Sequence, residues 1–441
     1  MAKVVKFGGS SLADANQFKK VAEIIRTDKD RCYIVPSAPG KRYPDDEKVT
    51  DLLYKCYDEM AQGEKAWRAF HPIEERFNEI ISDLGLNLDL REEYLKIIKG
   101  FKDRLGRDYA ASRGEYLNGI ILAEFLGYSF VDAADVVKFN YDDTFDAALT
   151  DEALEGALSG FCRAVIPGFY GAKPDGTIKT FSRGGSDVTG SIVAKAVKAE
   201  LYENWTDVSG FLVADPRIVE NPAVIETITY RELRELSYMG AGVLHEDAIF
   251  PVREAGIPIN IKNTNKTDDE GTWIVPEVDA PIKNIITGIA GKKNFSVIHI
   301  EKDRMNGELG FLRRILSLLE ILKINFEHIP TGIDTLSIVL ESKVFADYPD
   351  IIERIRKVAG IEKPNIIEAF HNLALIAVVG RGMRERLGTA SLIFAALSHA
   401  NINIRTIDQG SSELNIIIGV AEDDYEAAIR AIYEMSKQFL K

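Results

Sequence analysis

The first residues of the chain constrain its fold more than any other stretch, because an apolar strand runs directly into a glycine turn and a helix. The pattern predicts a short buried strand over residues 4–7 (VVKF) and a turn over residues 8–11 (GGSS). Ser11 and Asp14 are candidate helix caps. After them the apolar residues have the spacing of one buried helix face: Phe18, Val21, Ala22 and Ile25. This order of elements predicts the start of an open α/β sheet.

The same stretch has the parts of an anion cradle. Gly8 and Gly9 allow the backbone to approach phosphate oxygens, and free N–H groups at a helix start point at them. Lys6 places a positive charge at the carboxyl edge of the strand, where open α/β sheets bind ligands. The residues match neither the Walker A nor the G-x-G-x-x-G pattern. An ordinary tight turn beside a surface lysine therefore stays an alternative at this point.

Length and charge set the class of protein. A chain of 441 residues predicts two or three domains. Its net charge of −14 argues against general binding to nucleic acid, which requires a basic surface. The three cysteines have neither pairing nor metal-ligand spacing, as expected in a reducing compartment. No signal peptide and no apolar run of membrane-spanning length is present, so we expect a cytoplasmic protein with no membrane partner.

Further polar residues stand at predicted strand ends and helix starts. A second strand over residues 32–36 ends at Ser37, and a helical run follows Thr50. Glu115 lies in a long predicted helix beside a glycine, where a ligand amine is one possible partner and solvent is the other. A third strand is predicted over residues 131–139. A β-hairpin with a Pro-Asp-Gly turn is predicted over residues 170–181.

A second glycine-rich helix start follows at residues 182–187 (SRGGSD). Arg183 has the planar fork that holds a carboxylate through two hydrogen bonds. Asp187 is a candidate to orient Lys6 or a magnesium-bound phosphate. Helix capping is the alternative for Asp187, although capping leaves the preceding Arg-Gly-Gly unexplained.

Taken together, these motifs resemble the aspartokinase branch of the amino-acid kinase family. The matching segments occur in the family's order: residues 6–11, 112–115, 182–187, 206–208, 215–217 and 243–245. The resemblance implies an α/β fold, with an open mainly parallel sheet between helices, followed by two ferredoxin-like ACT domains. It implies transfer of the γ-phosphoryl group of ATP, with Mg²⁺, to the β-carboxylate of L-aspartate. An ionised carboxylate needs no general base, so positioning and charge neutralisation carry the reaction.

The resemblance also implies a role for each matching residue. Lys6 and Asp187 are the expected catalytic residues. The expected nucleotide side consists of Lys6, Gly8, Gly9, Ser10, Thr206, Asp207 and Arg217. The expected aspartate side consists of Ser37, Thr50, Glu115, Phe169, Arg183 and Ser186. Two departures concern the nucleotide side: Gly242 stands where many relatives carry lysine, and Leu212 where many carry an aromatic residue.

The C-terminal third contains two copies of a similar strand and helix pattern. Strands are predicted over residues 295–300, 324–329 and 335–340 in the first copy, and over 373–379, 402–407 and 414–420 in the second. An internal βαββαβ repeat is typical of ACT pairs. We therefore expect a kinase domain over residues 1–284, a first ACT region over 285–370 and a second ACT domain over 371–441. Residues 285–293 are expected to form a strand of the second domain, and pairing through ACT domains predicts a homodimer or tetramer.

The resemblance places an effector amino acid in the first ACT region, at Met305, Glu308, Gly310, Phe311, Leu312, Glu327, Thr331 and Asp334. The acids Glu327 and Asp334 favour the ammonium end of L-lysine over the neutral hydroxyl of threonine. Solvated surface acids are the alternative. Three functions remain: a feedback-controlled aspartate kinase, a kinase for another amino acid or for a nucleotide, and a catalytically silent amino-acid sensor.

Overall fold

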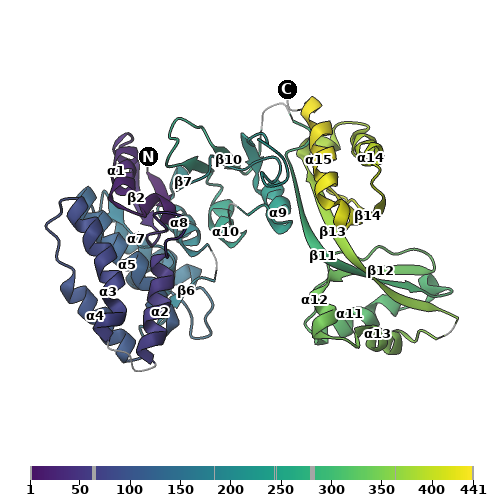
Figure 1. Cartoon of the computed structure of the whole chain (residues 1–441), viewed down its shortest axis with the longest axis horizontal. Helices are drawn as coiled ribbons and strands as arrows, with labels where there is room; N and C mark the ends of the chain where they lie inside the picture. Colours follow the sequence, from purple (N-terminus) through teal and green to yellow (C-terminus); the bar gives the residue numbers. More distant parts are fainter. Residues whose placement is uncertain are drawn as a thin grey trace. The chain divides into compact units, whose positions relative to one another are not determined.

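The computed structural model describes residues 2–61, 66–182, 184–242, 244, 246–278, 284–362 and 364–439. The chain forms two compact units (Figure 1). The first unit consists of Met1–Phe211, Val224–Leu233 and Gly242–Asp279. The second consists of Leu212–Ala223, Arg234–Ala241 and Ala280–Lys441. Each unit has its own sheet.

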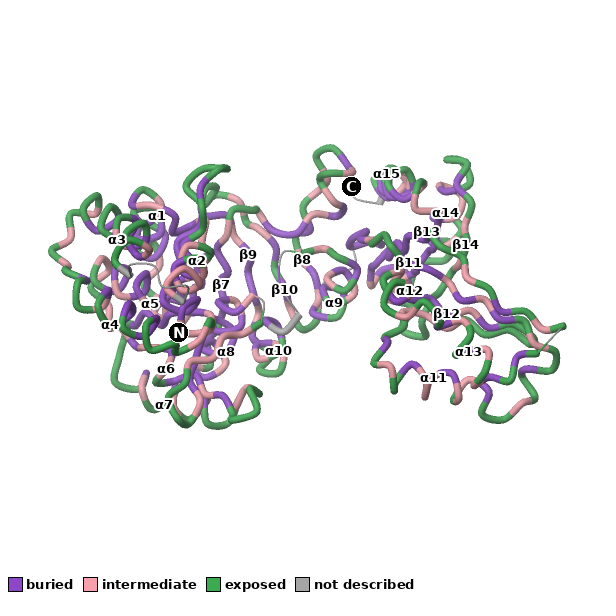
Figure 2. The backbone as a smooth tube through the Cα atoms, turned by 60° about the horizontal axis from the view of Figure 1, so that its bottom comes forward, coloured by how far each residue is buried: buried purple, intermediate pink, exposed green. Residues whose placement is uncertain are grey.

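The first unit is organised around an eight-stranded sheet of order β3-β4-β2-β1-β7-β9-β10-β8. Its strands are β1 Lys3–Phe7, β2 Arg31–Pro36, β3 Ser129–Phe130, β4 Ala164–Val165, β7 Leu201–Thr206, β8 Thr227–Thr229, β9 Ile259–Asn263 and β10 Thr272–Val275. All neighbours are parallel except β9 and β10. The predicted open, mainly parallel sheet is therefore confirmed. Its central strands are buried on both faces (Figure 2), as expected of a parallel sheet.

Helices cover both faces of this sheet. They are α1 Ala15–Arg26, α2 Val49–Ala61, α3 Ala66–Asp83, α4 Arg91–Lys102, α5 Arg107–Leu126, α6 Ala133–Val136, α7 Ala147–Leu158, α8 Gly185–Ala196 and α10 Glu246–Ala255, with the 3₁₀ turn η1 Gly9–Leu12. Apolar residues of α1 to α5 form one core with Val5 and Phe7 of β1. Because side chains alternate along a strand, Val4 and Lys6 point to the opposite face, where α8 packs on β1.

Local signals account for most of these elements. Asp14 caps α1 by accepting a hydrogen bond from the backbone N–H of Gln17, as predicted. The predicted hairpin forms from β5 Tyr170–Ala172 and β6 Ile178–Thr180. The strand predicted over residues 131–139 is wrong. The short helix α6 occupies this segment, because Asp132 caps it by accepting from the N–H of Ala134.

The second unit contains a five-stranded sheet of order β12-β11-β13-β15-β14. Its strands are β11 Gly288–Glu301, β12 Thr335–Glu341, β13 Ile366–Val379, β14 Ile404–Asp408 and β15 Asn415–Ala421, and all neighbours are antiparallel. The long strand β11 contributes to two parts of the sheet: residues 288–292 pair with residues 375–379 of β13, and residues 295–301 also pair with β12. The domain division at residues 370 and 371 stays a prediction.

The helices of the second unit are α11 Phe311–Ile321, α12 Lys343–Asp347, α13 Ile351–Ala359, α14 Thr389–His399 and α15 Tyr425–Ser436, with 3₁₀ turns η2 Met305–Gly307, η3 Arg381–Arg384, η4 Glu422–Asp424 and η5 Lys437–Phe439. Helix α9 Tyr230–Tyr238 contributes residues to both units. The strand predicted over residues 324–329 is wrong. This segment forms only an isolated bridge, between His328 and Val339, instead of a regular ladder.

Within the described residues, no helix is both long and apolar enough to cross a bilayer.

Candidate active site

Three polar side chains meet at the carboxyl edge of the first sheet. The Lys6 ammonium lies 2.6 Å from Asp187 Oδ1 and donates to Asn204 Oδ1 at 3.3 Å. The Asn204 amide in turn donates to Asp187 Oδ1 at 2.8 Å. Lys6 and Asn204 are buried and Asp187 is nearly so, so the ion pair is formed away from bulk water. The expected pairing of Lys6 with Asp187 is therefore present in the structure.

The local folding of three elements brings these groups together. Lys6 and Asn204 are register partners on the parallel strands β1 and β7, and Asp187 lies in the first turn of α8. Sequence reasoning missed Asn204. The available signal was its position inside the central strand β7, where a polar amide without a partner would be costly.

The glycine turn after β1 lies directly over this ion pair. The N–H of Gly8 donates to the Trp205 carbonyl at 2.9 Å, which ties the turn to β7. A Cβ on Gly8 would lie 3.7 Å from the Lys6 nitrogen and 3.9 Å from the Thr206 hydroxyl. Gly9 begins the turn η1, which also contains Ser10. Thr206 donates to the exposed carboxylate of Asp207 at 3.2 Å. The nucleotide-side residues of the first unit are therefore close neighbours.

Helix α5 supplies a buried carboxylate. Glu115 is 6% exposed, and among the described residues its Oε2 atom has no hydrogen-bond partner. Burial raises the pKa of the Glu115 carboxyl from its ordinary value of 4.5 to about 8, against the lowering effect of a backbone hydrogen bond from Ala38. A buried carboxyl group with one unsatisfied oxygen and no counter-charge lowers the stability of the fold. It is well suited to a ligand that brings a positive charge.

Two further residues of the expected aspartate side lie near the same helix. Ser37 follows β2, and its carbonyl accepts a hydrogen bond from the Asn118 amide at 2.7 Å. Asn118, one helical turn beyond Glu115, is fully buried, and sequence reasoning missed it. Thr50 is half-buried in the first turn of α2, which begins at Val49, instead of before the helix as a cap.

Phe169 packs against the start of α8, the helix that contains Ser186. The backbone of Phe169 has a φ of +82°, which is uncommon for a residue with a side chain. Its N–H donates to the Thr189 hydroxyl at 3.0 Å. A Cβ on Gly185 would lie 2.4 Å from the Phe169 ring, so only glycine fits there. The expected carboxylate clamp Arg183 lies outside the described residues.

One expected nucleotide residue belongs to the other unit. Arg217 lies in the segment Leu212–Ala223 of the second unit, where its exposed guanidinium pairs with Asp215 at 2.6 Å. Leu212 lies in the same segment and is half-buried. Gly242 lies in the first unit and is exposed.

The residues expected to bind an effector all lie in the second unit, and five of them lie just before or at the start of α11. Met305 and Phe311 belong to its apolar core, and Leu312 packs against that core. Gly310 precedes the helix with a φ of +79°. The carboxylate of Glu308 pairs with Arg314 and, at 2.5 Å, with Lys302.

The other three effector candidates have different partners. Asp334 accepts a hydrogen bond from the N–H of Arg304 at 2.8 Å. Glu327 accepts from the Tyr238 hydroxyl at 2.7 Å. Thr331 is exposed and forms an isolated bridge with Leu336. Glu327 is thus held by a neutral donor, while charged side chains already hold Glu308.

A cavity of about 930 Å³ lies elsewhere in the first unit, between α3 and the loop of residues 42–47. Its lining includes Arg42, Asp46, Arg76 and Glu79. None of the site residues predicted from the sequence lines it. The candidate active site is the group around Lys6, because the buried ion pair lies there directly under the glycine turn.

Comparisons with known proteins identify relatives of the chain. Residues 1–263 match the family model described as the amino acid kinase family, and residues 376–435 match one described as an ACT domain. Aspartokinase 3 of Bacillus subtilis is 39% identical over 448 residues, which cover 98% of each chain.

Solved structures show the same likeness. The crystal structure of the aspartate kinase of Clostridium acetobutylicum is 54% identical, with a TM-score of 0.90 over 98% of this chain and 99% of that one. Escherichia coli aspartokinase III is similar in fold. Its complex with aspartate and ADP is 23% identical, with a TM-score of 0.76 over 99% of each chain, and it has also been solved with lysine and aspartate.

A domain with a lysine and a glycine turn on an open parallel sheet, followed by an ACT domain, defines the class of protein. The chain belongs to the amino acid kinase family and, within it, to the aspartokinases, which are phosphotransferases.

Proposed function

We propose that this chain transfers the γ-phosphoryl group of ATP to the β-carboxylate of L-aspartate, giving 4-phospho-L-aspartate. This reaction would be the first step of the pathway to lysine, threonine and methionine. The observation that carries the proposal is the cluster of Lys6, Asp187 and Asn204 beneath the glycine turn, with the unpaired carboxylate of Glu115 on α5.

The chemistry follows from the charges in this cluster. The attacking β-carboxylate is already ionised at neutral pH, so the protein does not need to remove a proton. Negative charge on the transferred group is the obstacle. Lys6 with the amide of Gly9 would neutralise it, because the Gly8 N–H, also expected to contribute, already donates to the Trp205 carbonyl. Asp187 and Asn204 hold the Lys6 ammonium under the turn. The lysine ammonium is therefore preorganised before the reaction begins.

The aspartate side requires one anion and one cation site. Glu115 would take the α-ammonium, because ionising this buried carboxyl becomes favourable only beside a positive charge. Arg183 would clamp the α-carboxylate through its fork. Ser37, Thr50, Phe169 and Ser186 would surround the rest of the substrate.

The residues present also fit a magnesium ion. Mg²⁺ in phosphoryl-transfer sites is held by one or two carboxylates together with substrate phosphates. Within the described part of the chain, the Asp187 carboxylate contacts Lys6 and Asn204 through its Oδ1 atom alone, which leaves Oδ2 for an ion. No cluster of three metal-ligating side chains occurs in that part of the chain. Asp187 would hold the ion, which would supply charge neutralisation at the phosphates.

An assay of ADP release with a panel of amino acids tests the proposal. We expect turnover with L-aspartate and none with L-glutamate. Arg183→Lys keeps the charge but loses the fork, so the KM for aspartate should rise while the KM for ATP changes little. Turnover with another amino acid would point to a different kinase. Absence of turnover with every amino acid would leave a silent sensor.

We propose further that L-lysine inhibits the enzyme through the second unit. Glu327 supports this, because a neutral hydroxyl holds its carboxylate and an ammonium group would be a stronger partner. The N–H groups at the start of α11, around Gly310, suit the effector carboxylate. Lysine should inhibit turnover and raise the melting temperature by binding the folded state.

Glu327→Ala tests this site, with Glu341→Ala as its control. Both residues lie in the second unit, but Glu341 pairs with Lys343. Only Glu327→Ala should lose inhibition by lysine while keeping its uninhibited turnover. Inhibition by threonine alone, with no effect of lysine, would contradict the assignment.

The edge strands of the second sheet support a homodimer or tetramer. Strand β14 has only one neighbour in the sheet, whereas the segment of residues 327–331 bridges part of the outer edge of β12. Exposed strand edges commonly pair between ACT domains. Sedimentation of the full chain, with and without lysine, would measure the assembly.

A further inference from the structure

The four residues that follow β2 are held by hydrogen bonds to β1 and α5. The N–H of Ser37 donates to the Phe7 carbonyl at 3.0 Å, and the Ser37 carbonyl accepts from Asn118 at 2.7 Å. Ala38 donates its backbone N–H to Glu115. This segment, Ser37–Gly40, is therefore fixed to both β1 and α5.

The end of the segment is fixed to the glycine turn. The N–H of Gly40 donates to the Gly9 carbonyl at 2.8 Å. A Cβ on Gly9 would lie 2.8 Å from the Ala38 carbonyl, and a Cβ on Gly40 would lie 2.7 Å from the carbonyl carbon of Gly9. Neither position has room for a side chain. The two backbones are in direct contact, so a displacement of one must displace the other.

One buried arginine holds this contact from behind. Arg76 of α3 is 4% exposed, and its Nη2 atom donates to the Gly40 carbonyl at 2.7 Å and to the Ala13 carbonyl at 3.0 Å. Ala13 follows directly after η1, which begins at Gly9. A single guanidinium therefore binds both the segment that contacts the turn, at Gly40, and the residue that follows the turn, Ala13.

A carboxylate fixes the guanidinium in turn. Arg76 Nη1 lies 2.7 Å from Asp46 Oδ2, and the Asp46 side chain is 8% exposed. Hydrogen bonds from Arg42 and from Arg76 hold the pKa of the Asp46 carboxyl well below its usual range. The carboxylate thus stays ionised across the physiological pH range, and the ion pair persists.

We propose that Arg76 is a positioning residue for phosphoryl transfer, acting through the Gly40 and Ala13 carbonyls on the turn that contains Gly8 and Gly9. Arg76 is not among the residues around Lys6, and it is separated from the turn by these carbonyls. Its function rests on the proposed kinase activity. A displacement of the turn by about 1 Å would misplace its backbone relative to the transferred group, which can cost about 100-fold in rate.

The molecule offers a matched arginine with the same chemistry, which donates no hydrogen bond to Gly40 or Ala13 among the described contacts. Arg31 pairs with Glu203 at 2.8 Å and donates to the Ile24 carbonyl. Both arginines therefore combine a carboxylate with a backbone carbonyl in the first unit. Only Arg76 reaches the backbone on both sides of the glycine turn.

The test compares Arg76→Lys with Arg31→Lys in the full chain. Each lysine keeps the charge but loses the rigid fork that fixes its partners. We expect Arg76→Lys to lower kcat by at least about tenfold, with little change in either KM, as for a contact that acts on the transition state. Arg31→Lys should keep its kcat when it is assayed well below its melting temperature.

Asp46→Asn provides a second measurement if Arg76→Lys does not fold. It keeps the shape of the partner, weakens the anchor of Arg76 and should lower kcat in the same way. Equal kcat in all three variants and the unsubstituted chain would overturn the proposal. Losses of kcat that only parallel the fall in melting temperature would overturn it as well. ADP release is measured with whichever amino acid proves to be the substrate. A wrong substrate assignment is therefore distinguishable from a wrong role for Arg76.

Discussion

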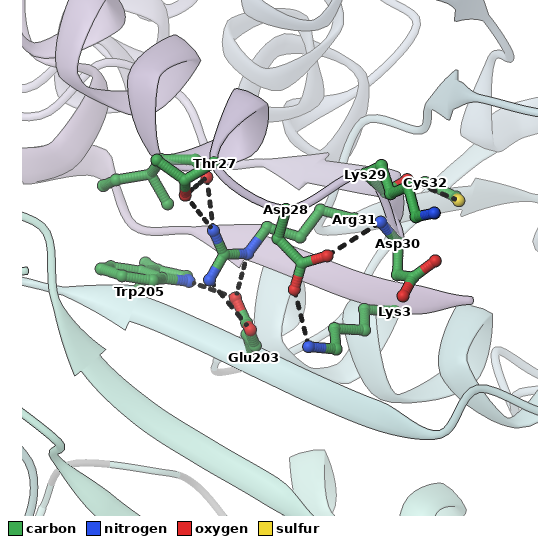
Figure 3. A network of polar contacts seen from close by, with 10 residues as sticks. Lys3, Thr27, Asp28, Lys29, Asp30, Arg31, Cys32, Glu203 and Trp205 are labelled. Carbon is green, nitrogen blue, oxygen red and sulfur yellow. Dashed lines mark hydrogen bonds and ion pairs between the residues drawn. The ribbon is translucent and has the colours of Figure 1, made fainter. Parts of the chain in front are cut away.

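The strand pair β1 and β7 carries one polar cluster on each face, and the two clusters differ in how completely they are paired. On the α8 face, Lys6 pairs with Asp187 and Asn204. On the α1 face, Arg31 pairs with Glu203 (Figure 3). Successive residues of β7 point to opposite faces, so Glu203 and Asn204 belong to different clusters although they are neighbours in sequence.

The cluster around Arg31 is closed by the protein itself. Glu203 Oε2 accepts from Arg31 Nε and from the Trp205 indole, both at 2.8 Å, and its Oε1 accepts from Arg31 at 3.2 Å. A further nitrogen of Arg31 donates to the Thr27 hydroxyl at 2.9 Å, as Figure 3 shows. Both oxygens of this buried carboxylate are satisfied, so the cluster has no capacity left for a ligand.

The candidate site at the carboxyl edge of the sheet keeps such capacity, on helix α5. Glu203 and Glu115 are both buried glutamates of the first unit, but Glu115 has an oxygen with no partner among the described residues. Closed pairing fixes a fold, whereas open pairing costs stability and is retained where a ligand completes it. The comparison therefore separates structural charges from functional ones within one domain.

The largest expected effect is on turnover, from Lys6→Ala. Losing one preorganised electrostatic contact should lower kcat on the order of 10²–10³-fold. Lys3→Ala is the control, because Lys3 lies on the same strand and pairs with Asp28 at 2.7 Å, away from the site. Steady-state kinetics on both variants, with circular dichroism to check folding, would measure the difference. Near-normal turnover in a folded Lys6→Ala chain would refute the catalytic role.

Glu203→Gln should affect stability and leave turnover intact. It keeps the shape but removes the charge that Arg31 faces, which should cost about 2–3 kcal/mol of unfolding free energy. Thermal melting should fall by several degrees, while kcat at low temperature stays unchanged. Glu200→Gln, an exposed glutamate directly before β7, should change neither. A large fall in kcat for Glu203→Gln would mean that the two faces are not separate.

Glu115→Gln should remove a pH dependence. The pKa of Glu115 in the folded chain is about 8, above its ordinary value of 4.5. Between pH 4.5 and about 8, the folded chain keeps a proton on Glu115 that the unfolded chain has already lost. The free energy of unfolding therefore falls as the pH rises from 4.5 through about 8. The ligand-free variant should melt above the unsubstituted chain at alkaline pH, and the difference should shrink towards pH 4.5.

Binding of the substrate gives an independent measurement of the same group. An ammonium ligand needs the ionised carboxylate, so the KM for aspartate should fall as the pH rises towards 8. In Glu115→Gln the KM should be raised and should lose this slope. The assignment of Glu115 to the ammonium fails if both proteins give the same slope.

Local patterns allowed much of the fold and site to be predicted. The glycine turn, the cap at Asp14 and the pairing of Lys6 with Asp187 follow from short motifs. Residues 131–139 were predicted as strand because an apolar run resembles both strand and buried helix, and the cap at Asp132 decides between them. Residues 324–329 have the composition of a strand, but they form only an isolated bridge to β12, at His328 and Val339, and composition does not show whether a neighbouring strand completes the pairing.

Residues that act through distant partners could not be found in this way. Asn204 lies 198 positions from Lys6, and Arg76 lies 36 positions from Gly40. No local spacing relates such pairs, because the sheet register and the placement of α3 bring them together. A polar residue in a buried element is a signal that a partner exists, but it does not identify the partner.

The smallest expected effect comes from Lys262→Met and tests how well the faces are separated. The Lys262 ammonium lies 5.3 Å from the Trp205 ring, which also stacks on Phe7. Methionine keeps most of the apolar stem, so the loss of the cation–π contact should cost less than about 1 kcal/mol. The indole fluorescence of Trp205 should change, while melting shifts only slightly and kcat stays as in the unsubstituted chain. Because Trp205 also accepts the Gly8 N–H through its carbonyl, a fall in kcat would show that its ring transmits strain to the turn. That result would break the comparison at its closest point, since only the backbone of β7 separates the two clusters there.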